Sequence, residues 1–353
     1  MADDLVGIYE IAQMARVTPA AVANWRARFP NFPSPVAELK GGPVFTRDRI
    51  RAWLRTRKVP MATVLSTINL KGGVGKTTTT IAIAEMLSAR HGKRVLVVDL
   101  DPQTNATVSL IGETRWRELN DAGHTVARLF ESVVDRDRDL PFDLEATIQR
   151  NVGTTEETRS LDLLPSSLDL IEVQDRLAGM GPGRFHTATP AEVLRRALRP
   201  VIDDYEYVLI DCPPSMGLIT LNGLRISHGY IIPTVPDFMS TYGIPQIIKR
   251  IGDFSDELGE QEIRPLGIVI SKFQGNSTVH HNQTRFLRNQ AAAGEGPPVF
   301  ETIIYQSNQI AAAAEGVATA TLRQKYGYAG QHDAYERLTR EVMEAAEEMA
   351  AVG

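Results

Sequence analysis

The stretch "NLKGGVGKTTTT", Asn69 to Thr80, holds the residues of this chain that are best suited to chemistry. It follows the phosphate-binding pattern G-x-x-x-x-G-K-[ST], except that Leu70 stands at the first glycine position and an additional lysine, Lys71, precedes the expected Lys76. Glycines let backbone N–H groups turn inward around phosphate, and the N-terminus of a following helix adds partial positive charge. Lys76 then neutralises phosphate oxygens and the Thr77 hydroxyl ligates Mg²⁺. The stretch therefore predicts a nucleoside triphosphate site.

The sequence on either side supplies the elements that such a loop needs. "ATVLSTINL", residues 62–70, is a short apolar run rich in β-branched residues, which predicts a buried parallel strand. The residues after the loop predict a helix that packs through Ile81, Ala84 and Leu87 and ends at Gly92. A strand, a glycine-rich loop and a helix, in this order, are the context that a P-loop requires.

Carboxylates end two further apolar runs of the chain. Asp99 and Asp101 close "RVLVVDLDPQ", and Asp211 closes "YEYVLIDCPPS". Because ligands bind at the carboxyl edge of parallel strands in open α/β folds, these three acids are expected beside the P-loop. One strand-end aspartate is commonly only a helix cap or a turn residue. Three that converge on a P-loop favour a role in catalysis or metal binding.

Three segments together resemble the ParA/MinD family of ATPases, and ParA-type partition ATPases in particular. "KGGVGKTT", "VLVVDLDPQTNAT" and "VLIDCPPSMGLITLNGL" are similar to its deviant Walker A, switch I and Walker B regions. The similarity covers roughly residues 62–330 and is weak over 112–160, where an acidic segment is expected to form variable surface. The resemblance implies an α/β fold with a doubly wound, mostly parallel sheet and an ATP-dependent sandwich dimer.

The resemblance also implies a role for each matching residue. Lys71 corresponds to the signature lysine that reaches the phosphates of the partner subunit's nucleotide, and Asp101 to the switch I aspartate that orients the attacking water. Asp211 is expected to hold Mg²⁺ through water together with Thr77, and Asp99 to support the magnesium shell. Lys76 corresponds to the ordinary P-loop lysine, and Thr78 is expected to contact the α-phosphate. The cradle around the phosphates is expected to consist of Gly72, Gly73, Val74 and Gly75.

By the same resemblance, the expected activity is slow hydrolysis of ATP to ADP and phosphate, coupled to homodimerisation and raised by a ParB-like centromere-binding protein. The expected function is DNA partition, the segregation of a plasmid or a chromosome, by a nucleoid-associated protein. Adenine preference rests on the family, since no N-K-x-D guanine motif is evident and the nearest segment, "ISKFQGN", lacks the aspartate. Two other functions stay open: an ATP-switched transcription regulator and a positioning ATPase for a protein cargo.

The first 60 residues are basic, whereas the rest of the chain is acidic. They contain ten Lys and Arg against five Asp and Glu, a charge of +5, so that the remaining residues carry −10 of the total of −5. Their pattern predicts two short helices around a turn, the second starting at Thr18 and Pro19, then a Pro/Gly-rich hairpin and a basic helix from Arg47. This order resembles the winged helix-turn-helix heads of the MerR and excisionase type, whose second helix enters the major groove.

That resemblance predicts DNA contacts from the head. Asn and Arg side chains suit adenine and guanine edges, and basic side chains reach phosphates. The expected DNA-binding residues are Thr18, Asn24, Arg26, Arg28 and Arg47. A protein-interaction domain and a simple structural extension are the alternative interpretations. The expected division is a winged helix-turn-helix domain at 1–58, a linker at 59–62 and a ParA-like P-loop ATPase domain at 63–353.

The chain departs from the family pattern near its C-terminus. Partition ATPases of this type carry a stretch resembling I-P-R-N-x-R, but here Tyr305, Gln306 and Gln309 stand where Pro, Arg and Arg are expected. Because nonspecific DNA affinity comes from phosphate-contacting cations, the head is expected to carry most of the DNA contact. The final segment, residues 331–352, combines an apolar face with an acidic one, which predicts core or dimer packing and no membrane contact.

Composition restricts the remaining classes of protein. The single cysteine, Cys212, excludes a disulfide framework and a multi-cysteine metal or iron–sulfur site within one chain, and it is expected to be buried. No run approaches the roughly 18 apolar residues that span a bilayer. The start, "MADDLVGIYE", lacks the basic and apolar segments of a secretory signal. A cytoplasmic location is therefore expected.

Overall fold

The computed structural model describes residues 5–15, 19–39, 41–56, 62–134, 141–178, 190–259, 262–307, 319–328 and 330–352. The chain divides into two units, one formed by residues 1–62 with 197–206 and the other by residues 63–196 with 207–353. Each unit is considered by itself, beginning with the larger one, which holds the P-loop.

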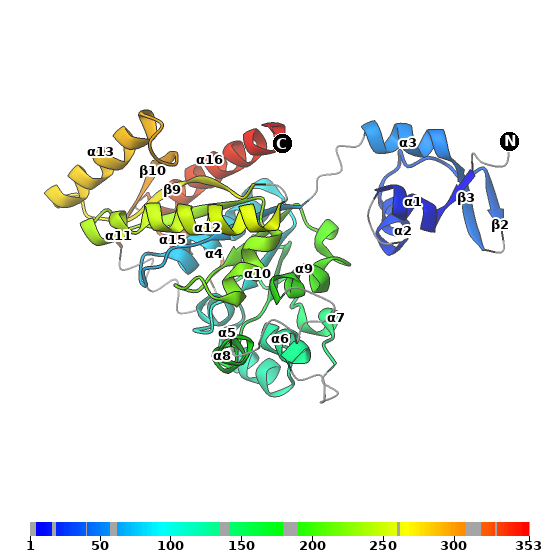
Figure 1. Ribbon diagram of the computed structural model, residues 1–353, viewed down its shortest axis with the longest axis horizontal. Helices are drawn as coiled ribbons and strands as arrows, with labels where there is room; N and C mark the ends of the chain where they lie inside the picture. Colours follow the sequence, from blue (N-terminus) through cyan, green and yellow to red (C-terminus); the bar gives the residue numbers. More distant parts are fainter. Residues whose placement is uncertain are drawn as a thin grey trace. The chain divides into compact units, whose positions relative to one another are not determined.

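A parallel sheet of seven strands within the described residues organises the larger unit (Figure 1). The strand order is β10-β9-β8-β4-β7-β5-β6, and the paired neighbours run parallel. The strands are β4 (Thr63–Thr67), β5 (Val95–Asp99), β6 (Leu161–Leu164), β7 (Tyr207–Asp211), β8 (Gly229–Thr234), β9 (Arg264–Phe273) and β10 (Val299–Tyr305). β4, which leads into the P-loop, lies in the middle between β7 and β8. The predicted doubly wound α/β fold is confirmed.

Helices alternate with these strands along the chain. They are α4 (Lys76–His91), α5 (Asn105–Asp121), α6 (Val126–Val134), α7 (Leu144–Thr147), α8 (Leu170–Ala178), α9 (Val193–Leu198), α10 (Leu218–Ile226), α11 (Phe238–Tyr242), α12 (Ile244–Leu258), α13 (Thr278–Ala292), α15 (Leu322–Tyr326) and α16 (Gln331–Val352). No described helix is both long enough and apolar enough to cross a membrane.

Apolar side chains fill the space between the sheet and its helices. All residues of β5 are buried, as expected for a parallel strand that is covered on both faces. α4 buries Ile81, Ala84 and Leu87 and ends at Gly92, whose φ of 61° is the left-handed conformation of a C-cap glycine. These features of the predicted P-loop helix are confirmed, as is the burial of Cys212 at the end of β7.

α16 packs against α4 and β10 through its apolar face. Tyr335, Leu338 and Val342 are at most 2% exposed, so the predicted core packing of the final helix is confirmed. The Glu341 carboxylate of the same helix accepts hydrogen bonds from the Glu301 and Thr302 backbone N–H groups of β10. This contact occupies donors of an edge strand that would otherwise stay unpaired.

Two predictions about the larger unit were wrong in detail. The strand expected over residues 62–70 ends at Thr67, because the Asn69 side chain donates to the Pro233 carbonyl and accepts from the Lys71 backbone, which turns the chain into the loop. The segment 112–160 is not only variable surface. Its helices bury Val126 and Phe130 completely, so part of it belongs to the core.

The smaller unit has a separate core at the N-terminal end of the chain. Its elements are β1 (Leu5–Gly7), α1 (Ile8–Ala15), α2 (Pro19–Arg28), β2 (Ala37–Leu39), β3 (Gly42–Thr46) and α3 (Arg47–Thr56), with an antiparallel sheet in the order β1-β3-β2. Val22, Trp25, Ile50 and Trp53 are buried in this core. The first strand, β1, was not predicted, because three residues are too short for a periodic signal.

Candidate nucleotide-binding site

The P-loop between β4 and α4 adopts a conformation that its glycines make accessible. Gly73 and Gly75 have φ values of 74° and 88°, in the left-handed region that L side chains rarely adopt. The buried Val74 fixes the loop from behind, since its carbonyl accepts a hydrogen bond from Ser271 Oγ at 2.6 Å. The loop thus leads directly into the N-terminus of α4, where backbone N–H groups bind anions.

Lys76 lies at the bottom of this loop and is 6% exposed. Its ammonium donates to the Lys71 carbonyl at 3.2 Å across the loop. Burial lowers the pKa of Lys76, and the nearby charges of Asp211 and Asp101 partly offset that effect. A buried cation beside the helix N-terminus is suited to neutralising a polyphosphate, because an anion restores the interactions that the ammonium loses by leaving water.

Three carboxylates gather at the carboxyl edge of the sheet, as predicted. Thr67, Asp99 and Asp211 are neighbours in register on β4, β5 and β7. Burial raises the pKa of Asp211 well above its usual range, and the charge of Asp99 raises it further. Burial also raises the pKa of Asp101, while a hydrogen bond from the Gln103 backbone and the charge of Lys76 lower it. Buried carboxylates this close together favour a nearby cation.

The oxygen donors at this edge fit a magnesium ion. Thr77 Oγ1 donates to Asp211 Oδ2 at 2.6 Å, so a hydroxyl and a carboxylate oxygen already face the same point. Hard oxygen donors of this kind are the ligands that Mg²⁺ uses together with substrate phosphates. Thr77 and Asp211 are the residues that would hold the ion, which would supply positive charge to the phosphates.

Asp99 is occupied by the protein itself. Its Oδ2 accepts from the Thr107 backbone N–H at 2.9 Å and from the Thr107 hydroxyl at 2.7 Å, and its Oδ1 accepts from the Asp101 backbone at 3.0 Å. Burial raises the pKa of Asp99 to about 7. These bonds attach the start of α5 and the backbone of Asp101 to the end of β5. A role for Asp99 in the magnesium shell remains a prediction.

Lys71 points away from the P-loop cradle. Its ammonium donates to Asp237 Oδ2 at 2.9 Å and to Ser240 Oγ at 2.9 Å. Asp237 also caps the N-terminus of α11 through the Ser240 backbone. Partial burial raises the pKa of Asp237, but the hydrogen bonds from Lys71 and Ser240 outweigh it, so the pKa lies below its usual value. The additional lysine is thus paired within its own chain.

A cavity of about 350 Å³ opens over the P-loop. Seven of the predicted site residues line it, namely Gly72, Gly73, Gly75, Lys76, Thr77, Thr78 and Asp101. Lys71, Val74, Asp99 and Asp211 are not among its lining residues, although Asp211 contacts Thr77 directly. Lys272, Lys325 and Tyr326 bound the cavity as well.

Sequence reasoning missed several residues of this site. Asp237 follows the apolar run of β8, so the strand-end rule that identified Asp211 could have found it. Ser271 also lies at a strand end, but a serine in that position carries no distinctive signal. Lys325 and Tyr326 lie in a polar segment well after β10 in the sequence. No sequence pattern in that segment indicates a contact with the P-loop helix.

The predicted DNA-binding residues are distributed over two helices of the smaller unit. Arg26 lies on α2, and its guanidinium forms an ion pair with Glu38 of β2 at 2.5 Å. Arg47 begins α3. Asn24 and Arg28 also belong to α2, but their side chains and Thr18 lie outside the described residues.

The structure also locates two of the three residues that depart from the family pattern. Tyr305 ends β10 and is half exposed. The side-chain oxygen of Gln306, Oε1, accepts a hydrogen bond from Gln274 Nε2 at 2.6 Å. Both therefore present uncharged surface. Gln309 lies outside the described residues.

Comparison with known proteins places this site in a family. Residues 62–263 match the AAA domain family. The chromosome-partitioning ATPase Soj of Thermus thermophilus is 31% identical over 280 residues, which cover 79% of this chain and 95% of Soj. An uncharacterized protein of Mycobacterium tuberculosis is 35% identical over 243 residues, 69% of this chain and 67% of that protein.

A solved structure extends the comparison to three dimensions. Cobyrinic acid a,c-diamide synthase from Mycobacterium smegmatis, with bound ADP and magnesium, has a TM-score of 0.60 and 26% identity and covers 81% of this chain and 96% of its own. The family match spans the P-loop, the acids at the sheet edge and the strands between them. The chain therefore belongs to the AAA-domain family of P-loop ATPases that includes the chromosome-partitioning ATPase Soj.

Proposed function

We propose that this protein is a DNA-partition ATPase that binds ATP with Mg²⁺, dimerises in the ATP-bound state and hydrolyses ATP slowly to ADP and phosphate. The observation that carries the proposal is the combination of a P-loop, three clustered aspartates and the additional lysine at position 71. The 31% identity to a chromosome-partitioning ATPase over nearly its whole length supports the same assignment.

Within this proposal, the P-loop residues from Gly72 to Thr78 bind the polyphosphate, and Thr77 and Asp211 hold Mg²⁺. Asp101 orients the attacking water, and both Asp101 and Lys76 line the cavity. Phosphoryl transfer depends mainly on positioning and on charge stabilisation, both of which this arrangement supplies.

The surface around Lys71 supports a homodimer. Phe238, Met239 and Tyr242 of α11 are between 65% and 70% exposed, and they lie next to Asp237, the partner of Lys71. An exposed cluster of large apolar side chains marks a protein interface more often than free surface. In the proposed dimer, a second subunit covers this cluster and Lys71 reaches the partner's nucleotide.

The proposed winged helix-turn-helix domain, residues 1–58, belongs to the smaller unit and makes most of the DNA contact through α2 and the basic α3. Its separate core and its +5 charge support an independent DNA-binding domain. A ParB-like centromere-binding protein is the proposed activator, and the proposed location is the nucleoid in the cytoplasm.

The decisive experiment compares the wild type with Lys71→Ala. Analytical ultracentrifugation with ATP, ADP and no nucleotide should show an ATP-dependent dimer for the wild type only, and hydrolysis should be lost in the variant. ATP-dependent dimerisation and hydrolysis by Lys71→Ala would contradict the proposed role of Lys71. Partition itself predicts that a small DNA-binding partner together with DNA raises the ATPase rate, whereas an ATP-switched transcription regulator would show no such increase.

A further inference from the structure

Glu85 is a fully buried carboxylate in the middle of α4, and the nucleotide chemistry described above does not use it. Lys325 Nζ donates to its two oxygens at 2.9 and 3.0 Å. The Thr154 hydroxyl donates to Oε1 at 2.7 Å and the Tyr326 hydroxyl to Oε2 at 2.6 Å. Three side chains from two distant parts of the chain therefore converge on one acid of the phosphate-binding helix.

Two of these partners, Lys325 and Tyr326, also line the nucleotide cavity. The Lys325 ammonium has three N–H donors, and the two Glu85 oxygens with Thr154 Oγ1 at 2.9 Å provide three acceptors. Lys325 therefore borders the cavity while its charge is fully engaged inside the protein. The Tyr326 ring is held between this junction and Tyr335, with ring centroids 5.2 Å apart.

This junction determines where α15 lies. Removal of one partner of a buried ion pair leaves an uncompensated charge in the interior, which costs far more than the loss of a surface pair. α15 consequently cannot leave α4 unless Glu85 loses its counter-charge. The cavity wall formed by Lys325 and Tyr326 is thus held in place by a residue of the phosphate-binding helix itself.

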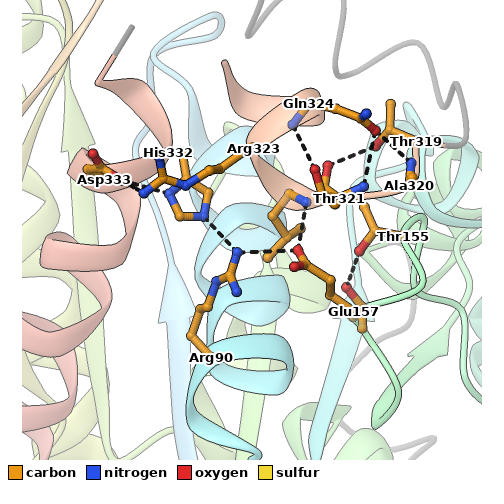
Figure 2. A network of polar contacts seen from close by, with 12 residues as sticks. Arg90, Thr155, Glu157, Thr319, Ala320, Thr321, Arg323, Gln324, His332 and Asp333 are labelled. Atoms are coloured by element: carbon orange, nitrogen blue, oxygen red, sulfur yellow. Dashed lines mark hydrogen bonds and ion pairs between the residues drawn. The ribbon is translucent and has the colours of Figure 1, made fainter. Parts of the chain in front are cut away.

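A second set of contacts holds the beginning of α15 (Figure 2). Glu157 Oε2 accepts from the Leu322 backbone N–H at 2.9 Å and from Arg90 Nη2 at 3.3 Å. Figure 2 shows the Arg90 guanidinium between Glu157 and His332, and its distance to His332 Nε2 is 3.2 Å. Since Arg90 also belongs to α4, that helix supports the start of α15 indirectly, through Glu157.

The cavity has a polar part and an apolar part. The P-loop, Lys76 and Thr77 form the polar part, which suits a triphosphate. Ile81 and Val108, with the nearly buried Lys325 and Tyr326, bound a less polar part that suits the other half of a nucleotide. A nucleotide with its phosphates on the P-loop therefore has an apolar surface available for its nucleoside.

We propose that Glu85 is a positioning residue for the nucleoside half of ATP: it fixes Lys325 and Tyr326 as the wall against which the nucleoside packs. The proposal rests on ATP binding at the P-loop, but it is independent of dimerisation, DNA binding and partition. It predicts that disturbing Glu85 weakens the binding of the nucleoside and leaves the binding of the phosphates unchanged.

The test uses the full-length chain and two probes with Mg²⁺, a non-hydrolysable ATP analogue and inorganic tripolyphosphate, in isothermal titration calorimetry. For Glu85→Gln we expect the Kd of the analogue to rise about tenfold, because the Lys325 charge loses its partner. The Kd of tripolyphosphate should stay within about twofold, because the P-loop is intact. In steady-state kinetics, KM should rise while kcat at saturating ATP changes little.

A rescue variant and a control separate positioning from general stability. Glu85→Gln combined with Lys325→Met makes the junction neutral at similar volume, and the affinity for the analogue should return to within about threefold of wild type. Arg225→Gln breaks a partly buried ion pair, with Glu192, and neither residue lines the cavity. It should lower the melting temperature without changing the ratio of the two Kd values.

Each outcome has a definite meaning. An equal loss of affinity for both probes, or a lower melting temperature with unchanged affinities, would show that Glu85 is only structural. If Glu85→Gln does not fold, Tyr326→Phe removes a single hydroxyl from the junction and should still weaken the analogue selectively; unchanged affinity would overturn the proposal. If the wild type binds neither probe, the nucleotide site itself is wrong, which is a different failure.

Discussion

Lys71 is paired with Asp237 and Ser240 of its own chain, yet its proposed task is to reach the nucleotide of a second subunit. The side chains of Lys71 and Asp237 are 42% and 32% exposed, so their ion pair is partly solvated. Pairs of this kind contribute little to stability, about 1 kcal/mol or less. The contact is therefore weak enough to be exchanged when a partner subunit arrives.

Asp237→Asn should strengthen ATP-dependent dimerisation. Asparagine is as good a helix N-cap as aspartate, so α11 stays capped while the charge that retains Lys71 is removed. We expect the dimer dissociation constant to fall about two- to fivefold, in keeping with the small value of an exposed ion pair. Sedimentation equilibrium with ATP measures it. An unchanged or weaker dimer would show that Asp237 does not compete with the partner's nucleotide.

Asp99 gives the nucleotide-free protein a characteristic pH dependence. Its pKa is raised to about 7 in the folded state because of burial, although hydrogen bonds from Thr107 and Asp101 oppose the shift. The unfolded chain ionises near the ordinary value of about 4. The contribution of Asp99 to stability is therefore complete below that value and is lost as the pH rises through about 7.

Comparison with Asp99→Asn removes the titration of Asp99 together with its effect on the pKa of Asp211. Relative to wild type, the variant should gain about 1 kcal/mol in the free energy of unfolding between pH 6 and pH 8, because it cannot ionise. Urea denaturation at several pH values measures the difference. A difference that is independent of pH would mean that Asp99 titrates outside this range.

At the level of elements, the P-loop depends on the backbone conformation of Gly75. Its φ of 88° is strained for any residue with a Cβ, although a Cβ would find ordinary contact distances, the nearest being 3.8 Å from Ser271. Gly75→Ala should therefore distort the loop through its backbone at a cost of about 1 kcal/mol or more and weaken ATP binding about fivefold or more.

A matched control is available on α12. Gly252 has no left-handed φ, and a Cβ there would meet nothing within 4 Å. Gly252→Ala should leave ATP affinity unchanged and stability equal or slightly higher, because alanine favours a helix interior. Calorimetric titration with the ATP analogue compares the two variants. Equal affinities for Gly75→Ala and wild type would contradict the proposed phosphate cradle.

For the whole molecule, the charge asymmetry predicts which unit responds to salt. If the basic head supplies the phosphate contacts, the double variant Arg26→Ala with Arg28→Ala should bind DNA with a weaker salt dependence. The slope of the logarithm of the DNA association constant against the logarithm of the salt concentration should become less steep by about 2. Lys249→Ala with Arg250→Ala removes two cations from α12 and should leave the slope unchanged. Fluorescence anisotropy with duplex DNA, with and without ATP, measures both. A lower slope for the α12 variant alone would assign DNA binding to the ATPase core.

Much of the molecule follows from local patterns in the chain. The P-loop helix, the strand-end aspartates, the buried Trp25 and Trp53 of the head and the apolar face of the final helix were all predictable, because each depends on spacing within one element. The strand over 62–70 was predicted too long, because the Asn69 side chain ends it through contacts with Pro233, which is distant in the sequence.

The sequence by itself determined that this protein has a phosphate-binding loop, acids at a sheet edge and a lysine that a single P-loop does not need. The tertiary structure alone decided the partners of those residues. Lys71 pairs with an aspartate 166 residues away, and Glu85 with a lysine 240 residues away. Such pairs depend on which strands lie side by side and on which helices cover them. This arrangement of strands and helices is set by the burial of apolar surface over the whole chain, which no local pattern of residues predicts.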